Sequence, residues 1–281
     1  MRRHLQRTIG RLSEVAQTSC IYGAVLPNLA LRAGALALMA LAGAPAARAD
    51  EVQAKHLLKA MSDYMTAQKA ISLEYDSNLE IVTKQDQKLA LASSGTVTLA
   101  RPDKIHATRW GGFANVELVF DGKTLSLLRK DSNQYAQAEI PGTVDQLVDE
   151  LRDKLHRPLP AADLLMSDPY SQLMPTVVDV KDLGSGVIRG EECDHLAFRT
   201  NEGVDWQIWI HQGERPYPCR YLITSTKVAG FPQYTVDVRS WKTGAEVAGD
   251  DFSFKVPDGA KQLKPTDIPG VDELPEAFTV R

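Results

Sequence analysis

The sequence predicts a mainly β (α+β) fold, in which a strongly curved antiparallel sheet, or unclosed β-barrel, is covered by an N-terminal helix and a central helical lid. Three observations support this fold class. Turn signals rich in Gly, Pro, Asp and Asn recur at almost constant intervals between residues 101 and 142, as they do between strands joined by tight turns. A segment with helical periodicity precedes these strands, and a second helical segment interrupts them. Helices inserted among strands with one apolar face are expected to cover that face.

A secretory leader is expected at the N-terminus. The apolar run from Ala33 to Ala47 leads into the small-x-small signature Ala47-Arg48-Ala49. This run is too short for a membrane span, which needs about 18 apolar residues. We therefore expect residues 1–49 to be a signal peptide cleaved after Ala49, and residues 50–281 to form a single soluble periplasmic domain without stable membrane insertion.

The mature chain is expected to open with an amphipathic helix over residues 51–70, because its apolar residues recur at spacings of three and four. Strands follow, and the clearest hairpin is centred on Asp121-Gly122, where a type I′ turn is expected. Thr143 and Gln146 form a capping-box pair, and apolar residues at helical spacing continue from there to Leu155. The strand pattern is therefore interrupted by a helix.

A second short helix carrying Leu164 to Met166 is expected to complete the helical insert, which prolines 169 and 175 close. Strands then resume, with a turn at Gly184-Ser185-Gly186, three strands near residues 192–200, 204–211 and 217–226, and a long strand from Tyr234 to Trp241. The tail from about residue 257 is rich in Pro, Asp and Glu and is expected to be mostly coil.

The charge of the mature chain excludes two kinds of partner. The leader holds six of the 32 basic residues and one of the 36 acidic residues, so the mature net charge is −9. Nucleic acid is therefore an unsuitable partner. Adsorption to an anionic lipid surface is disfavoured for the same reason, although an apolar pocket that takes one lipid at a time is not.

Two cysteines, Cys193 and Cys219, remain after cleavage, and in an oxidising compartment such a pair is expected to form a structural disulfide. Strands two apart in a plain meander are separated by about 9.6 Å at ~4.8 Å per strand. Bridged Cα atoms are usually less than about 7 Å apart. The bridge therefore requires one cysteine in a turn, and Pro216 and Pro218 favour a turn before Cys219.

A search for catalytic chemistry finds one candidate, the triplet Cys193-Asp194-His195, in which a thiol and an imidazole two residues apart share a strand face. In an oxidising compartment that thiol is expected to form a disulfide with the second cysteine, and no third group orients the imidazole, so we do not expect catalysis. The five mature histidines lack the paired spacing of metal ligands. We expect a protein without enzymatic activity, metal or cofactor.

Several runs resemble known families. The run from Gly95 to Lys104, together with Ile105, Trp110 and residues 121–125, resembles the outer-membrane lipoprotein carrier superfamily (LolA- and LolB-like). Residues 193–199, 205–210 and 218–224 are similar to a family of predicted periplasmic proteins of unknown function within that superfamily. The resemblance implies an unclosed barrel of about eleven strands with helices as a lid over a hydrophobic cavity. The carriers use an arginine near the cavity, and Arg109 is the nearest match by position.

The expected function is that of a periplasmic carrier or binding protein for a lipid, acyl chain or other hydrophobic molecule. The alternative is a ligand-sensing or protein-interaction module of the cell envelope with a packed core, and a partner protein of the envelope is compatible with either. The helix from Val144 to Leu155 is expected to act as a lid. The expected lining of the cavity, with Arg109 at its mouth, is Leu99, Trp110, Leu118, Phe120, Leu147, Leu151 and Trp206.

Overall fold

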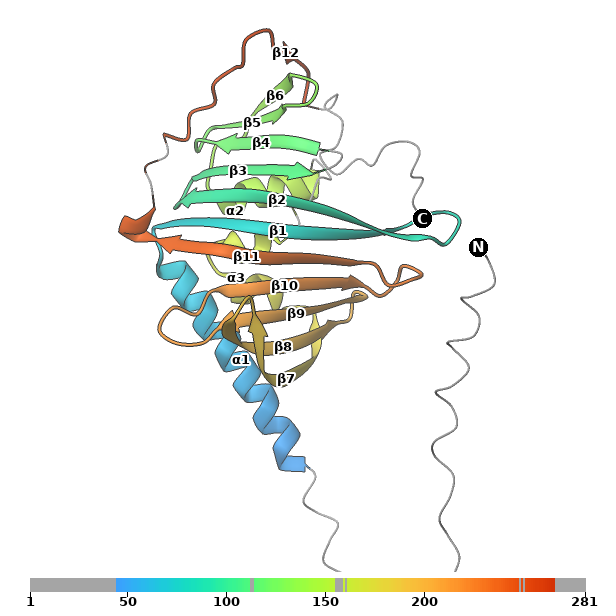
Figure 1. The fold of residues 1–281 in the computed structure, drawn as a ribbon. Helices are drawn as coiled ribbons and strands as arrows, with labels where there is room; N and C mark the ends of the chain where they lie inside the picture. The colour runs from blue at the N-terminus through green and yellow to red at the C-terminus, as the bar shows by residue number, and fades with distance from the viewer. Residues whose placement is uncertain are drawn as a thin grey trace, which may run out of the picture. The chain divides into compact units, whose positions relative to one another are not determined.

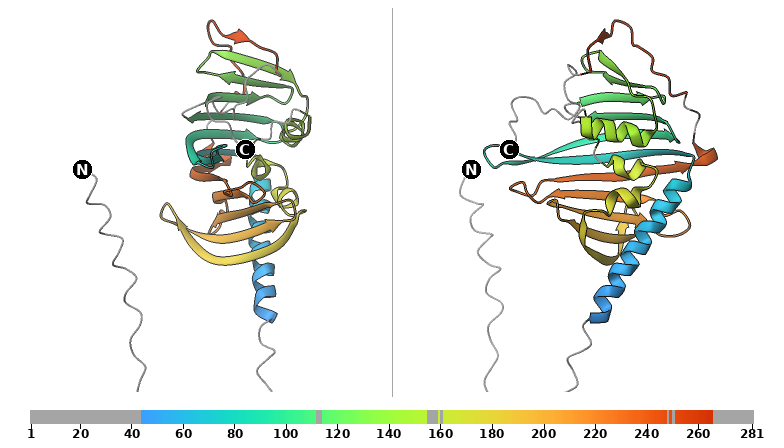
Figure 2. Two further views of the ribbon diagram at one scale, coloured as in Figure 1. Left: turned by 90° about the vertical axis from the view of Figure 1, so that its right-hand side faces the viewer. Right: turned by 180° about the vertical axis from the view of Figure 1, so that it is seen from behind.

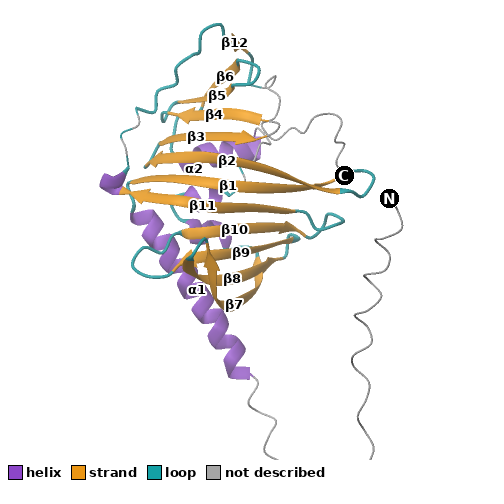
Figure 3. Cartoon of the chain, viewed as in Figure 1, coloured by secondary structure: helices purple, strands orange, loops and turns teal. Residues whose placement is uncertain are grey.

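The computed structural model describes residues 44–111, 114–154, 159, 161–247, 249 and 251–265. Most of the predicted leader lies outside the described residues. The described chain forms one curved, unclosed sheet of twelve strands with helices packed on one of its faces (Figures 1 and 3). The expected mainly β fold is therefore confirmed, with twelve strands in place of about eleven.

The sheet consists of two antiparallel meanders joined side by side. Its strand order is β12-β6-β5-β4-β3-β2-β1-β11-β10-β9-β8-β7, and the meanders meet where β1 pairs with β11, with Ile71 opposite Thr243. Neighbouring strands are antiparallel, apart from the parallel pair of β12 and β6. The strands are β1 (Ala70–Val82), β2 (Lys88–Ala100), β3 (Lys104–Gly111), β4 (Ala114–Phe120), β5 (Thr124–Arg129), β6 (Gln134–Glu139), β7 (Val177–Ile188), β8 (Glu191–Thr200), β9 (Val204–His211), β10 (Pro218–Ser225), β11 (Gln233–Thr243) and β12 (Lys261–Gln262).

Apart from a short 3₁₀-helix that directly follows β11, the helices lie on the same face of the sheet (Figure 2). They are α1 (Ala44–Ala67), α2 (Val144–Asp149), the π-helix η1 (Glu150–Lys154), the 3₁₀-helix η2 (Ala162–Leu165), α3 (Pro169–Leu173) and the 3₁₀-helix η3 (Gly244–Glu246). Within the described residues, no helix is both long and apolar enough to cross a membrane.

The buried apolar residues of the helix-covered face form two clusters, one in each meander. The α2 cluster joins the cover to β1–β5 and consists of Ile71, Leu73, Val97, Leu99, Ile105, Leu118, Phe120, Leu125, Ile140, Val144, Leu147, Val148, Leu151, Ala162 and Met166. The α1 cluster joins α1 to β8–β10 and consists of Ala54, Leu58, Met61, Met65, Leu164, Leu173, Leu196, Phe198, Trp206, Ile208, Ile210 and Tyr221. The apolar stripe predicted for the first helix is thus confirmed as part of the core.

Two helical predictions need correction. The first helix runs from Ala44 to Ala67 instead of over residues 51–70, because β1 already begins at Ala70. Pro169 was expected to help close the helical insert. It begins α3 instead, in the first turn, where its missing N–H removes no helical hydrogen bond.

Two turn predictions and the expectation of a coil tail also need correction. The Asp121-Gly122 hairpin is present, but of these two residues only Gly122 has a positive φ. Asp121 Oδ1 instead accepts hydrogen bonds from the amides of Lys123 and Thr124, at 2.9 and 2.8 Å. The Gly184-Ser185-Gly186 run lies inside β7, where Gly184 falls in a register shift between Asp182 and Ser185, and the chain reverses afterwards at Arg189-Gly190. The tail contributes β12, because its residues 261–262 pair with β6.

Candidate functional site

The cover over the first meander starts at a capping box. Thr143 Oγ1 accepts a hydrogen bond from the Gln146 amide at 3.3 Å, and Gln146 Oε1 accepts one from the Thr143 amide at 2.8 Å. These two bonds give hydrogen-bond partners to backbone N–H groups at the start of α2, and they fix the direction in which the chain enters the helix. The helix then turns Val144, Leu147 and Val148 toward the sheet. The capping box predicted from the sequence is confirmed.

The cover then changes its helical form. After α2 the chain continues as the π-helix η1, which still turns Leu151 into the α2 cluster. A π-turn inside a helix is rare and is found frequently at functional sites. As far as Leu151, the apolar stripe of the predicted lid therefore faces the sheet, whereas Leu155 lies outside the described residues. The described part of the lid is the short α-helix α2 followed by the π-helix η1, rather than one continuous α-helix.

The structure brings together five of the seven residues predicted to line a cavity. Leu99, Leu118 and Phe120 from the sheet meet Leu147 and Leu151 from the cover in the α2 cluster. Leu99 and Phe120 have no exposed surface and Leu147 keeps only 1%. The sheet and the cover are therefore in direct contact at the predicted site.

The other two residues lie elsewhere. Trp206 belongs to the α1 cluster, where its ring stacks on Phe198 with centroids 3.8 Å apart. Trp110 is 45% exposed, because it alternates with the inward residues of β3 and so points to the open face of the sheet. These two tryptophans do not join the predicted lining.

Arg109 is half-buried on the helix-covered face of β3. It stands opposite Gly95 on β2 and Val116 on β4, two residues along the strand from Ala107, which packs against the α2 cluster. Arg109 therefore lies on the same face as the cluster, beyond its edge. This position is compatible with the predicted place at a cavity mouth, which stays a prediction.

Tyr75 is a contributor that the sequence analysis missed. Its ring packs against the α2 cluster and passes over Gly95, where an added Cβ would lie 2.5 Å from the ring Cζ and 2.2 Å from the Thr108 carbonyl oxygen. The available signal was the isolated glycine inside a strand, which marks a close approach of neighbouring atoms.

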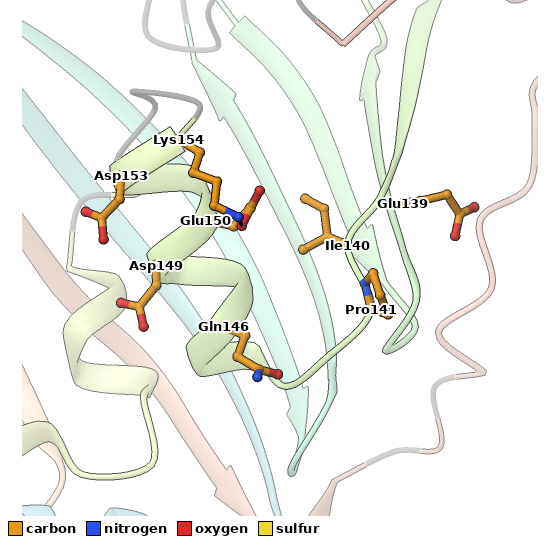
Figure 4. Close-up of a pocket in the computed structure, with 8 residues that line it drawn as sticks. All are labelled: Glu139, Ile140, Pro141, Gln146, Asp149, Glu150, Asp153 and Lys154. Carbon is orange, nitrogen blue, oxygen red and sulfur yellow. Dashed lines mark ion pairs between the residues drawn. The ribbon is translucent and has the colours of Figure 1, made fainter.

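A polar pocket of about 480 Å³ lies beside the cover, between the end of β6 and helices α2 and η1 (Figure 4). In Figure 4 the side chains of Glu150 and Lys154 lie together between η1 and the strands, whereas Glu139 points away from η1. Lys154 Nζ pairs with Glu150 at 2.6 Å. The pocket is lined by Glu139, Ile140, Pro141, Gln146, Asp149, Glu150, Asp153 and Lys154.

This lining is acidic and does not suit an apolar ligand. Among the described residues, no group of three or more His, Cys, Asp or Glu side chains is placed to hold a metal ion. The apolar α2 cluster is therefore a better candidate for a functional site than the pocket beside it.

The Cys193-Asp194-His195 triplet does not form a thiol–imidazole pair. His195 Nε2 lies 2.9 Å from Gln207 Oε1, and its ring stacks on Trp209 with centroids 3.9 Å apart. The Cys193 thiol is fully buried, and burial raises its pKa. An activated nucleophilic cysteine has a lowered pKa instead.

The expected disulfide is not formed in the structure, where Cys193 and Cys219 are both free and buried. The two side chains nevertheless pack together in a small buried cluster with Ile188, and the Cys193 thiol donates a hydrogen bond to the Glu191 carbonyl at 3.6 Å. Desolvation raises the pKa of the Cys219 thiol strongly. The pair is in contact as the sequence predicts, and the bridge itself stays a prediction.

The chain was compared with known proteins. No curated protein matches the sequence. The solved structures that resemble it include an uncharacterized conserved protein from Thermus thermophilus, with 11% identity, a TM-score of 0.40 and coverage of 75% of this chain and 99% of that chain. The complex structure of Pseudomonas aeruginosa MucA/MucB contains a chain with 15% identity, a TM-score of 0.40 and coverage of 72% and 61%. This chain thus spans less than two thirds of that protein.

A third similar structure is the Mycobacterium tuberculosis lipoprotein LppX, with 11% identity, a TM-score of 0.34 and coverage of 68% of this chain and 96% of that chain. The decisive comparison is with a protein family. A model described as a predicted periplasmic protein (DUF2092) matches residues 54–264, which is most of the chain. The resemblance seen in the sequence is thereby confirmed, and the chain belongs to the DUF2092 family of predicted periplasmic proteins.

Proposed function

We propose that this protein is a periplasmic carrier or binding protein for an apolar molecule such as an acyl chain, held between the sheet and the cover formed by α2, η1 and η2. The observation that carries the proposal is the α2 cluster itself. Short helices supply one half of a large apolar cluster, and a continuous sheet supplies the other half. The proposed function includes no catalytic step.

The construction of the cover supports this proposal. Helix α2 has six residues, η1 five and η2 four. Isolated helices shorter than ~12 residues are marginal in water, so the position of the cover depends on its contacts with the sheet. Its polar contacts with the β2–β3 turn include hydrogen bonds from Arg101 Nη2 to the Met166 carbonyl at 3.1 Å and from the Val144 amide to the Pro102 carbonyl at 2.9 Å. The remaining contacts between the cover and the sheet are apolar, and an apolar ligand can make similar contacts in their place.

The burial of the cluster defines the state of the proposed site. Because Leu99 and Phe120 have no exposed surface, no water-sized space adjoins them, and the site is closed. Binding therefore requires the cover to move away from the sheet. The apolar surface exposed by that movement, which costs roughly 25 cal/mol per Å², is covered again by the ligand.

The same burial favours one second candidate, a protein-interaction module of the cell envelope with a permanently packed core. In that case the cover has a structural role only, and the protein takes up no apolar molecule. The two candidates therefore differ in a single measurable property, which is the uptake of an apolar probe by the folded protein.

Two features of maturation belong to the proposal. We propose export with cleavage after Ala49, since Ala54, Leu58 and Met61, which α1 buries against the sheet, all follow the cut. We also propose a disulfide between Cys193 and Cys219 in the exported protein, since their thiols are already in contact.

The decisive experiment measures the binding of a fluorescent fatty acid to the mature chain and to two variants at one position. Leu151→Ala removes buried apolar atoms and leaves space in the α2 cluster, so it should strengthen or preserve uptake. Leu151→Asp places a carboxylate in the same apolar site and should weaken uptake strongly. Lys84→Asp, at an exposed position in the turn between β1 and β2, is the control for a charge change away from the cover and should bind like the wild type.

Circular dichroism and urea unfolding establish that each variant is folded. A folded wild-type protein that takes up no probe and carries no co-purified lipid in native mass spectrometry contradicts the carrier function. That result leaves the interaction module as the better description.

A further inference from the structure

The two terminal strands of the sheet differ in length. One side ends at β12, which has two residues, and the other ends at β7, which has twelve. No strand within the described residues pairs with the outer edge of β7. The backbone along this edge is thus available to another strand, and such an edge is a template for pairing with a second chain.

Several aliphatic side chains on β7 are exposed to solvent. Val178, Leu183 and Val187 are exposed to 63%, 48% and 66%, and all three lie on β7. Single exposed aliphatic residues are common, but three on one terminal strand leave an apolar edge in water.

The register of β7 limits where a second strand can pair. Shifts between Val177 and Asp179 and between Asp182 and Ser185 leave a regular segment from Asp179 to Asp182. In this segment Val180 packs on the helix-covered face, against the α1 cluster. Asp179 and Lys181 therefore share the opposite face, where their side chains form an ion pair and are 44% and 58% exposed.

From these observations we propose that β7 pairs antiparallel with β7 of a second copy of this chain, around a two-fold axis at Val180. This register places Asp179 opposite Lys181 of the second copy twice, on one face, and Val180 opposite Val180 on the other face. Opposite charges directly across two strands stabilise a pair, and like charges destabilise it. A two-fold interface uses the same patch on both copies, as this alternation requires.

Charge is the reason to favour a second copy over an unrelated strand. A lysine on an edge strand normally deters pairing with neutral strands. Here the same segment also carries Asp179, and the two-fold axis places the Asp179 carboxylate of one copy opposite Lys181 of the other copy.

Sedimentation equilibrium of the mature chain tests the proposal through charge exchange. The wild type should show a concentration-dependent dimer. Asp179→Lys and Lys181→Asp should each be monomeric, because each places like charges across the axis. An equimolar mixture of these two variants should dimerise again, as should the double variant D179K/K181D. Lys84→Asp, at an exposed position in the turn between β1 and β2, is the control for a charge change elsewhere and should dimerise like the wild type.

A wild-type chain that stays monomeric at the highest soluble concentration overturns the proposal. In that case the edge of β7 does not pair with a second copy of this chain. A dimer that survives both single charge reversals overturns it equally. Neither measurement needs an apolar ligand, so the outcome is independent of the proposed carrier function.

Discussion

The thiols of Cys193 and Cys219 lie against each other, although β9 runs between the strands that carry them. The register explains this contact. Cys219 has no partner on β9, because Pro218 stands opposite Ile210 and Arg220 opposite Trp209. The sequence predicts a turn before Cys219, and the structure has a β-bulge at Cys219, at the start of β10, instead. A bulge changes the direction of a side chain without ending the strand.

We expect this pair to be oxidised in protein recovered from an oxidising compartment. Closure of the loop between the two cysteines should raise the free energy of unfolding by about 3 kcal/mol in the chain-entropy model. Thiol counting in denaturant without reductant measures the oxidation, and urea unfolding with and without reductant measures the stabilisation. Two titratable thiols in such protein would contradict the bridge.

Gly95→Ala should destabilise the fold by roughly 1–3 kcal/mol, the usual cost of overpacking. The new Cβ would lie 2.2 Å from the Thr108 carbonyl oxygen, and this backbone atom cannot rotate away. Gly249→Ala is the matched control, since nothing lies within 4 Å of its added Cβ. Urea unfolding of both variants is the measurement. Equal midpoints would show that the Tyr75 ring and the Thr108 carbonyl leave room for a Cβ at position 95.

Asp163→Asn should stabilise the protein at neutral pH. Asp163 lies in η2 between two buried residues, and burial raises the pKa of its carboxyl group above the ordinary 3.8. The folded state therefore holds the proton more tightly than the unfolded state. Stability should fall as the pH rises from about 3.8 through the raised folded-state pKa, and it should stay lower above that pKa.

Unfolding curves between pH 3 and pH 8 test this sign. The gain from Asp163→Asn should be present at pH 7 and should vanish below about pH 3.8, where both states are protonated. Asp153→Asn, at an exposed position on η1, should change stability by less than about 0.5 kcal/mol. A constant gain at every pH would assign the effect to packing instead of ionisation.

Sequencing of the exported protein should give an N-terminus at Asp50. This cut removes the first six residues of α1 and keeps Ala54, Leu58, Met61 and Met65, which pack on the second meander. The mature chain and the chain with its leader should therefore unfold at the same urea midpoint. An N-terminus upstream of Ala33, or retention in the membrane fraction, would be incompatible with the assigned leader.

The features that could be predicted from the sequence depend on local patterns. Alternation and turn residues located the strands near residues 192–200, 204–211 and 217–226, and the pair Thr143 and Gln146 located the start of α2. The pairing of β1 with β11 and of β12 with β6 joins segments far apart in the chain, and no local pattern encodes it.

The predicted lining was partly wrong for a different reason. Trp110 is five residues from the inward-facing Ile105 on the same strand, and an odd spacing places it on the opposite face. This parity was readable in the sequence. Trp206 does face the helices, but it lies in the other meander, and only the order of the strands reveals that separation.

The junction of β1 and β11 determines when the sheet can be completed. A chain that emerges from its N-terminus presents β1 early, and the outer edge of this thirteen-residue strand has no partner until β11, the last long strand, has followed. Pairing of such distant segments is intrinsically slow, and an unpaired strand edge is prone to aggregation while it waits. The two meanders each consist of neighbouring strands, whereas their union joins segments far apart in the chain, and a chain that stops before residue 233 would lack this union entirely.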